Sequence, residues 1–356
     1  MSSEIANIDA ATERRLNPAV PSALARRSAL RLAGLFALLA VLALAAILSL
    51  AIGARPVTPE TVIDALLRFD PTNSDHLVVR DLRLPRTGIA IAVGVALAIA
   101  GALMQALTRN PLADPALLGV NSGAALAVVG TIFLLGIRTP GILAWCAFIG
   151  AGGIAFLVHA FASVGRGGAT PVRLALAGAA VNAMLMGLIG AVLILSQDTF
   201  DAYRFWMVGS LSAANAVPAV DMLPFIAMGL VLAALIGPAL NTIALGDDAA
   251  RALGTRIGLV RFGALAAVTL LSGAAVAVAG PVSFVGLVVP HLARALTGAD
   301  QRWLMAYAAI IGPIVLLSAD VLGRVVLPPG EVQVGIIMAL AGGPLFIAIV
   351  RRMRMA

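Results

Sequence analysis

The chain has no lysine, because all 24 of its basic residues are arginine. A P-loop needs a lysine to reach nucleotide phosphates and a Schiff-base enzyme needs a lysine amine, so both chemistries are excluded. The single cysteine, Cys146, excludes a disulfide within the chain, and the three histidines lie far apart in the sequence. The sequence therefore predicts a chain without catalytic residues, without a metal site and without a bound cofactor.

Charge of either sign is also scarce. Only 12% of the 356 residues are charged, whereas 61% are hydrophobic, and the mean hydropathy is +1.04. A soluble domain carries roughly a quarter charged residues. The composition therefore predicts that lipid surrounds most of the chain. The net charge of +7 is attributed to loop arginines that orient a membrane protein, and no basic stripe interleaved with aromatic residues points to nucleic acid.

Long runs without charge define the candidate membrane helices. They cover residues 32–54, 88–108, 115–137, 139–165, 174–197, 222–246, 262–293, about 303–319 and 332–350. All but one have the length of a single crossing, about 20 residues. The run 262–293 contains Gly280 and Pro281 at its middle and Pro290 near its end. It is either one long kinked helix or a full span followed by a short returning span.

The distribution of arginine favours the second interpretation. Basic residues prefer cytoplasmic loops, and arginines cluster at both ends of the chain, namely Arg14, Arg15, Arg26, Arg27 and Arg31 at the start and Arg351, Arg352 and Arg354 at the close. Both termini are therefore predicted to be cytoplasmic, which requires an even number of crossings and gives about ten. We expect a cytoplasmic tail over 1–31, a transmembrane domain over 32–350 with a cytoplasmic segment at about 244–256, and a tail over 351–356.

Two similar segments suggest an internal repeat. Residues 96–101 read ALAIAG and residues 275–280 read AVAVAG, in predicted spans of opposite direction. Inverted repeats are common in transporters, although alanine-rich membrane sequence also produces such matches by chance.

Five motifs, in order, resemble the FecCD family of ABC-transporter permeases, which import iron–siderophore complexes, haem and vitamin B12. The motifs are LRLPRT at 82–87, ALMQALTRNPLADPALLGVNSGA at 102–124, ALGDDAARALG at 244–254, GPVSFVGLVVPHLAR at 280–294 and ALAGGPLFIAIVRR at 339–352. The resemblance covers most of the chain from about residue 32. Within the family, YRFWMVGSL at 203–211 and the turn RNPLADP look most like permeases for ferric catecholate siderophores such as ferric enterobactin.

The resemblance implies an all-α polytopic protein with the fold of a type II ABC importer. It also implies the bacterial inner membrane and several partners: a second permease (a sibling or an identical chain), two ATPase subunits that hold ATP and magnesium, and an extracytoplasmic substrate-binding protein that delivers a ferric siderophore. Haem or vitamin B12 is the alternative cargo.

Three arginines are candidates for contact with the binding protein. Arg83 and Arg86 flank Pro85 ahead of the second span. With the N-terminus in the cytoplasm they fall on the outer face, although arginine generally prefers cytoplasmic loops. The resemblance implies that they and Arg324 meet acidic residues of the binding protein on the outer face. The alternative is that they anchor helix ends at the interface. Asp320 lies four residues before Arg324, which predicts an internal ion pair that positions Arg324.

The segment 244–254 predicts a short cytoplasmic helix. Asp247 and Asp248 would complement the dipole at its start, and glycines at both ends allow sharp turns. An ordinary surface helix has the same pattern. The resemblance implies a coupling helix that fits the ATPase, with these residues: Gly246, Asp247, Asp248, Ala249, Arg251, Ala252, Leu253 and Gly254.

Polar residues inside the spans are few. We predict that Gln105 and Asn121 form hydrogen bonds between helices, although any polar group inside a membrane is also a functional candidate. The resemblance implies that the fifth span lines the translocation pathway, where Asn182, Met184, Met186 and Gln197 are candidates. A secondary transporter driven by ions is the rival class. It would need carboxylates at mid-membrane, and the predicted spans have none there.

Overall fold

The computed structural model describes residues 20–53, 56–164, 170–212, 215–328 and 330–353, and this part of the chain is almost entirely helical. The first half contains α2 Val20–Ala51, α3 Pro59–Leu67, α4 Ser74–Leu77, the π-helix η1 Val78–Arg83, α5 Leu84–Thr108, the 3-10 helix η2 Pro115–Leu118, α6 Val120–Leu135, α7 Pro140–Ser163 and α8 Pro171–Leu195. The second half contains α9 Gln197–Met207, α10 Ala216–Ile243, α11 Asp247–Ala252, α12 Ile257–Ala279, α13 Val285–Thr297, α14 Gln301–Val326 and α15 Val334–Met353.

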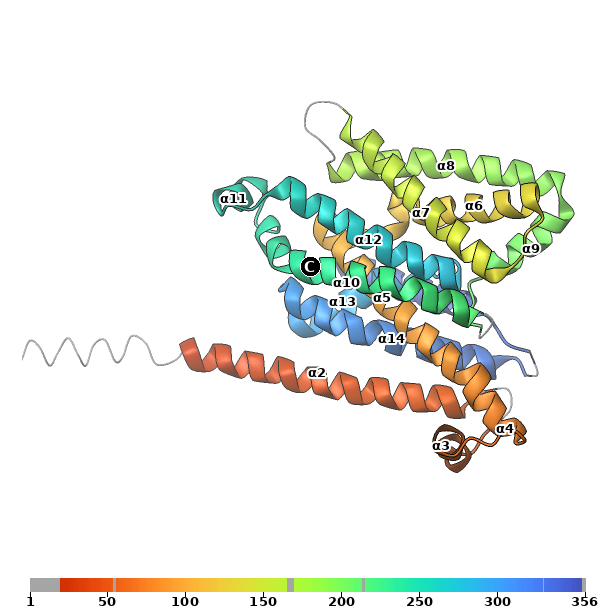
Figure 1. Ribbon diagram of the computed structural model, residues 1–356. Helices are drawn as coiled ribbons and strands as arrows, with labels where there is room; N and C mark the ends of the chain where they lie inside the picture. The colour runs from red at the N-terminus through yellow and green to blue at the C-terminus, as the bar shows by residue number, and fades with distance from the viewer. Residues whose placement is uncertain (1–19, 54–55, 165–169, 213–214, 329, 354–356) are drawn as a thin grey trace, which may run out of the picture.

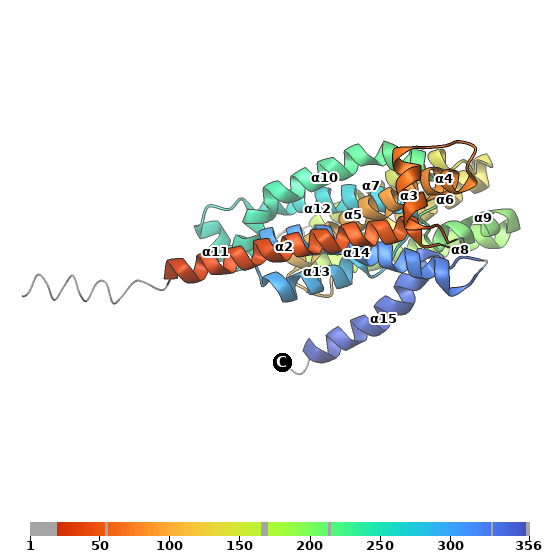
Figure 2. The same ribbon diagram turned by 90° about the horizontal axis from the view of Figure 1, so that it is seen from below.

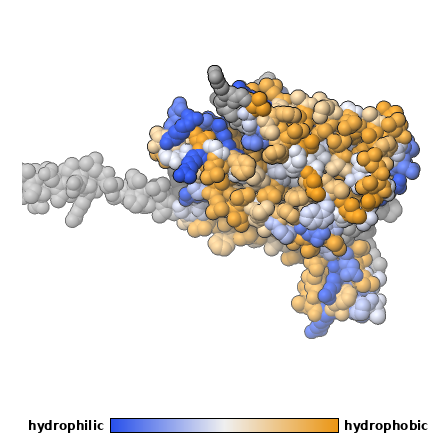
Figure 3. Space-filling model, turned by 45° about the horizontal axis from the view of Figure 1, so that its top comes forward, coloured by the Kyte–Doolittle hydropathy of each residue, from blue (hydrophilic) through white to orange (hydrophobic). Residues whose placement is uncertain are grey.

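Eight of these helices are long and apolar enough to cross a membrane, and α6 and α13 are shorter apolar helices. The predicted fold class is confirmed: the described residues form an all-α bundle with ten apolar helices. At 1.5 Å per residue, the 13 residues of α13 extend over only about 20 Å, less than the hydrocarbon core of a bilayer. Figure 3 shows a broad apolar surface, with polar residues gathered toward the ends of the molecule.

The predicted break in the run 262–293 is confirmed. Helix α12 ends at Ala279, and Gly280 has φ 70° and ψ −175°, a conformation that residues with a Cβ rarely adopt. Phe284, with φ 69°, precedes the first residue of α13. The backbone of this loop is bonded within the protein, since Ser210 N donates to Ala279 O at 2.7 Å. Irregular backbone inside a membrane requires such partners.

The helix ends divide the molecule into two faces (Figures 1 and 2). The N-terminal end of α2, the short helix α11 and the C-terminal end of α15 lie toward one end, which we call the α11 end. Helices α3, α4 and α9 lie at the opposite end. The first helix begins at Val20, whereas the predicted boundary between the tail and the first membrane span is at residue 32. The helix therefore extends beyond the apolar run and includes the polar segment with Arg26, Arg27 and Arg31. Residues 1–19 lie outside the described residues, as do Arg166 and Arg354.

Helix α5 lies at the centre of the bundle, where it packs against α12, α13 and α14. Close approach is possible because small residues stand at the crossings, as is typical of membrane helices. A Cβ added to Gly101 would lie 1.9 Å from Gly286 O of α13, and one added to Gly94 would lie 2.7 Å from the Pro313 backbone of α14. The spacing of α5 from its neighbours therefore depends on the absence of side chains at these positions.

The substitution Gly101→Ala is expected to destabilise the bundle by about 1–3 kcal/mol, the usual cost of overpacking, because α5 and α13 must move apart. Thermal unfolding of the detergent-solubilised chain measures this loss. The control is Gly153→Ala in α7, where an added Cβ meets no atom within 4 Å; the midpoint should stay the same or rise slightly. Equal midpoints for the two variants would contradict the packing argument.

Candidate functional site

The segment predicted as a coupling helix forms the short helix α11 at the α11 end. Its first turn carries Asp247 and Asp248, and Arg251 lies in its last turn. Gly246 and Gly254 have φ of 110° and 79°, so both turns use the left-handed region that glycine permits. The predicted helix and its glycine-dependent ends are thus confirmed. Most of the predicted coupling residues are exposed to solvent, namely Asp248, Ala249, Arg251, Ala252, Leu253 and Gly254.

Asp247 connects α11 to two core helices. Its Oδ1 accepts a short hydrogen bond from Arg109 Nη2, and its Oδ2 accepts one from Arg261 Nη2 at 2.8 Å. Arg109 caps the C-terminus of α5 in the left-handed conformation, with φ 51°, and Arg261 belongs to α12. Asp248 differs, because among the residues that the structure describes its carboxylate bonds only Arg251 of the same helix, at 3.0 Å. A displacement of α11 would therefore reach α5 and α12 through Asp247.

The charge on Asp247 persists at neutral pH. Burial alone would raise the pKa of Asp247, but the hydrogen bond from Arg109 and the positive charge of Arg261 outweigh it and lower the pKa below its ordinary value. A lowered carboxylate pKa gives stability that is complete above the ordinary value and is lost only as the pH falls through the folded-state value. The connection therefore does not change between pH 6 and 8.

The three arginines predicted to dock a binding protein lie at the opposite end, where two of them cap α2. Arg83 Nη1 donates to Leu50 O and Ala51 O, both at 2.7 Å. Arg324 Nη1 donates to Ser49 O at 2.9 Å and to Ile52 O at 3.0 Å. The last carbonyls of a helix have no partner within the helix and carry partial negative charge, so a guanidinium group satisfies both needs.

A carboxylate joins these arginines to each other. Asp320 Oδ2 lies 3.1 Å from Arg324 Nη2, which confirms the predicted ion pair, and Asp320 Oδ1 lies 2.8 Å from Arg86 Nη2. Arg86 also bonds Glu331 at 2.6 Å. Direct contact with a binding protein would require exposed side chains, and we expected Arg83 and Arg86 to be exposed. That expectation is wrong: Arg83 is 6% exposed and Arg324 is 2% exposed, and the side chain of Arg86 is 16% exposed. Their role in docking stays a prediction.

Helix α8 presents most of its surface outward and lines a cavity of about 390 Å³ together with α6, α9 and the loop before η2. Asn182 and Met186, two of the four candidate pathway residues, lie one turn apart and line this cavity. Their role in a translocation pathway stays a prediction. The cavity does not include Met184 or Gln197, since Met184 lies on another face of α8 and Gln197 begins α9. All four candidates are exposed in the single chain.

The two polar residues assigned to helix packing behave differently. Gln105 Nε2 donates to Gly286 O and Leu287 O of α13, at 3.4 and 3.2 Å, as predicted. The side chain of Asn121 forms no hydrogen bond among the described residues, contrary to the prediction, and lines the α8 cavity together with Asp114. The sequence analysis did not predict that Asn121 and Asp114 lie at this cavity. The sequence signal was the pair of asparagines, Asn121 and Asn182, in two neighbouring apolar helices.

These features are those of a polytopic membrane protein, and comparison with known proteins shows that its class is that of transport permeases. The chain belongs to the FecCD transport family, whose model matches residues 41–352. It is 43% identical over 318 residues to the ferric enterobactin permease FepD of Escherichia coli, covering 88% of this chain and 94% of FepD. It is 39% identical over 329 residues to the Fe(3+)-citrate permease YfmD of Bacillus subtilis, covering 92% and 97%. The hemin permease HmuU of Yersinia pestis is 40% identical over 280 residues, covering 77% and 83%.

A solved structure supports the same conclusion. The chain superposes on an ABC transporter of the metal-chelate type, in an inward-facing conformation, with a TM-score of 0.77 and 26% identity, covering 89% of this chain and 98% of the other. The fold is that of a type II importer permease, and the protein is a permease of the iron–siderophore and haem importer family.

The substitution Arg324→Gln is expected to destabilise the chain by about 3–5 kcal/mol, because it breaks a buried ion pair and removes the donors to Ser49 O and Ile52 O. Hydrogen exchange should then accelerate at the C-terminal end of α2. Arg138→Gln is the control, since its pair with Asp198 is long, at 3.6 Å, and both side chains are more than half exposed. That variant should change stability by less than about 1 kcal/mol. Unchanged exchange at residues 48–52 in Arg324→Gln would contradict the capping role.

Proposed function

We propose that this chain is the permease subunit of an ATP-driven importer that moves a ferric siderophore across the cytoplasmic membrane of a bacterium after delivery by a substrate-binding protein. The α11 end would face the cytoplasm, and with it the N-terminal end of α2 and the C-terminal end of α15. The chain would supply helices and surfaces, and two copies of a separate ATPase would bind ATP and magnesium. The observation that carries the proposal is the connection of the exposed α11 to α5 and α12 through Asp247.

The surface of α11 supports contact with a protein. Leu245 and Leu253, on either side of the helix, are 69% and 63% exposed although they lie outside the apolar spans. Two large apolar side chains exposed on either side of one short helix, beyond the ends of the membrane helices, would be covered if a partner protein packed against α11. The ATPase would therefore press on α11, and the ion pairs of Asp247 would carry that displacement to the core helices.

Asp247→Asn is expected to uncouple ATP hydrolysis from uptake, because an amide cannot form ion pairs with Arg109 and Arg261. We expect uptake of ferric siderophore to fall at least about tenfold, from the loss of charged hydrogen bonds worth about 1.5–3 kcal/mol, while the ATPase keeps hydrolysing. Both rates are measured on the complete transporter in proteoliposomes.

Asp248→Asn is the matched control, since that side chain is fully exposed and bonds only within α11. Its coupling ratio should stay within about twofold of wild type, the scale of an exposed pair. If Asp247→Asn also kept the normal coupling ratio, the claim that Asp247 transmits the displacement of α11 to α5 and α12 would be refuted. If uptake persisted with an ATPase unable to hydrolyse ATP, the whole proposal would fail, and an ion-coupled transporter would become the better explanation.

A second permease, a sibling or an identical chain, would complete the pathway. In the single chain only 22% of the apolar stretch of α8 is buried, and the α8 cavity opens on the exposed face of that helix. A partner packed near α8 would enclose Asn182 and Met186 in a wall that is mainly apolar. Such a wall suits a bulky chelate, because few polar groups would hold it during passage.

At the outer end, the surface around Arg86 would receive the binding protein. Arg83 and Arg324 cap α2 and would fix the backbone on which Arg86 stands, so we propose that they position the site. Glu331, whose side chain is 36% exposed, already pairs with Arg86. An acidic residue of the binding protein would compete with Glu331 for the same guanidinium group.

This arrangement gives opposite expectations for two neighbouring substitutions. Arg86→Gln should weaken docking of the binding protein, by a factor of up to about five, and Glu331→Gln should strengthen it by a similar factor, as exposed pairs are worth about 0–1 kcal/mol. Affinity is measured on the reconstituted transporter as a function of salt, since charged contacts weaken as ionic strength rises. Unchanged affinity in Arg86→Gln would remove the docking assignment.

Cargo is proposed at the level of ferric siderophores, with a catecholate such as enterobactin first. Relatives named for enterobactin, citrate and hemin are 43%, 39% and 40% identical, so identity does not separate these ligands. Competition uptake with ferric catecholate, ferric citrate, haem and vitamin B12 tests the choice. Preference for haem or vitamin B12 would refute the assignment of a siderophore as cargo but leave the assignment as a permease subunit intact.

A further inference from the structure

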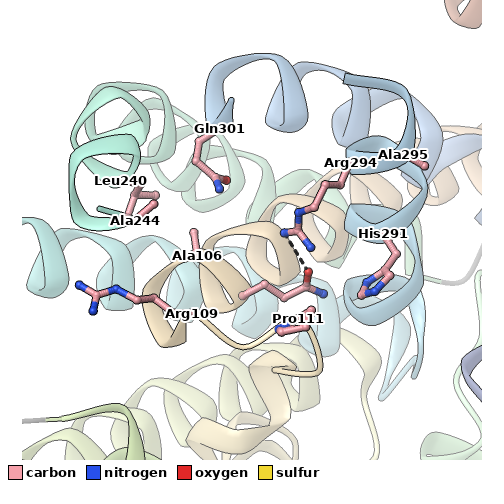
Figure 4. Close-up of a pocket in the computed structure, with 10 residues that line it drawn as sticks. Ala106, Arg109, Pro111, Leu240, Ala244, His291, Arg294, Ala295 and Gln301 are labelled. Atoms are coloured by element: carbon pink, nitrogen blue, oxygen red, sulfur yellow. Dashed lines mark hydrogen bonds between the residues drawn. The ribbon is translucent and has the colours of Figure 1, made fainter. Parts of the chain in front are cut away.

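A cavity of about 570 Å³ opens at the α11 end, between the ends of four helices (Figure 4). Helix α5 contributes Gln105 and Arg109, and α13 contributes His291 and Arg294. Leu240 and Ala244 of α10 and Gln301 at the start of α14 complete most of the wall. The cavity is separate from the α8 cavity, because the two share no lining residue.

The charge of this cavity is positive and incompletely paired. No carboxylate lines it. Arg109 is paired with Asp247, but Arg294 forms no ion pair among the described residues. The one hydrogen bond that Arg294 makes is long, 3.4 Å from its Nη2 to Gln105 Oε1. A guanidinium group has five N–H donors, so most of those of Arg294 remain available toward the cavity.

One further polar atom of the wall has no partner. Gln301 is only 7% exposed, and its Oε1 is buried and forms no hydrogen bond among the described residues. Figure 4 shows Gln301, Arg294 and His291 arranged around the opening, and its dashed line marks the hydrogen bond that Arg294 donates to Gln105. Buried polar groups without partners are uncommon and call for an explanation, such as a bound ion. Amide rotation of Gln301 would present its NH2 group to an anion in place of its oxygen.

We propose that this cavity binds a phosphate group, held by Arg294 and assisted by Gln301 and His291. Arginine forks match the oxygens of phosphate, and pairs of this kind are among the strongest hydrogen bonds in proteins. The phosphate belongs to an anionic lipid headgroup or is free in solution. Basic pockets between helix ends at a cytoplasmic membrane surface are typical sites for lipid headgroups.

The apolar surroundings suit a lipid. Leu240, Ala244 and Ala295 contribute apolar wall, and on α13 the side chains of Leu292 and Leu296 are 38% and 61% exposed beside it. Acyl chains could lie against these leucines while the headgroup occupies the cavity. This inference uses the proposed function only for the orientation of the α11 end, so a protein that failed to import siderophores could still bind phosphate here.

The test counts lipids on the full-length chain, purified together with its associated subunits in mixed micelles of phosphatidylglycerol and phosphatidylcholine. Native mass spectrometry measures bound lipid, and inorganic phosphate serves as competitor. Wild type should retain phosphatidylglycerol in preference to phosphatidylcholine. Arg294→Gln should lower that retention about tenfold or more, the effect of losing a charged hydrogen bond. Arg302→Gln, an exposed arginine at the same end outside the cavity wall, should not.

A second variant protects the test against misfolding of Arg294→Gln. Ala295→Asp puts a carboxylate on the exposed part of the wall without removing any contact of Arg294, and it should abolish anion binding. A second outcome is that wild type retains both lipids equally, while calorimetry detects binding of inorganic phosphate to wild type and no such binding to either variant. The site then holds free phosphate, and the proposal stands. The proposal falls if both variants match wild type. It also falls if they change only the attachment of the ATPase, because the cavity would then receive a protein side chain.

Discussion

Lipid offers no hydrogen bonds, so every backbone group at membrane depth must find its partner within the protein. The positions where helices of this chain end or bend show the consequence. Proline at 290 has no N–H, which frees the carbonyl of Gly286, and Gln105 of α5 donates to that carbonyl at 3.4 Å. The final carbonyls of α2 face the guanidinium groups of Arg83 and Arg324. Gln105, Arg83 and Arg324 therefore use their side-chain donors to satisfy backbone carbonyls at the places where helices end or bend.

The same constraint distributes the arginines unequally between the two ends. At the end of α3 and α4, Arg86 and Arg324 share Asp320, and Arg83 is buried against carbonyls, so these three arginines present little of their charge to the surface. At the α11 end, Asp247 draws Arg109 and Arg261 together, whereas Arg294 pairs with no carboxylate of the described residues. The arginines buried at the first end are thus satisfied by the protein itself, whereas Arg294 at the other end keeps donors for a ligand.

Much of the candidate site followed from local pattern. The short helix α11 could be predicted because its acidic start and its two glycines are adjacent in sequence, and helix-end chemistry acts over a few residues. Asn182 and Met186 fall one turn apart, so one helix places both at the α8 cavity. The environment of Arg83 and Arg324 could not be predicted. Their partners lie in α2, and Arg324 Nη1 and Ser49 O are 275 positions apart.

The sequence by itself determined that the chain lies in lipid, that it forms ten apolar helices with a break near residue 280, and that it belongs among ABC importer permeases. Hydropathy, helix-breaking residues and motifs act within one segment, which is why a single chain reveals them. Only the tertiary structure decided which arginines are satisfied internally and which remain available. Pairing depends on where distant helix ends meet, and that position is set by the packing of α5 through Gly94 and Gly101.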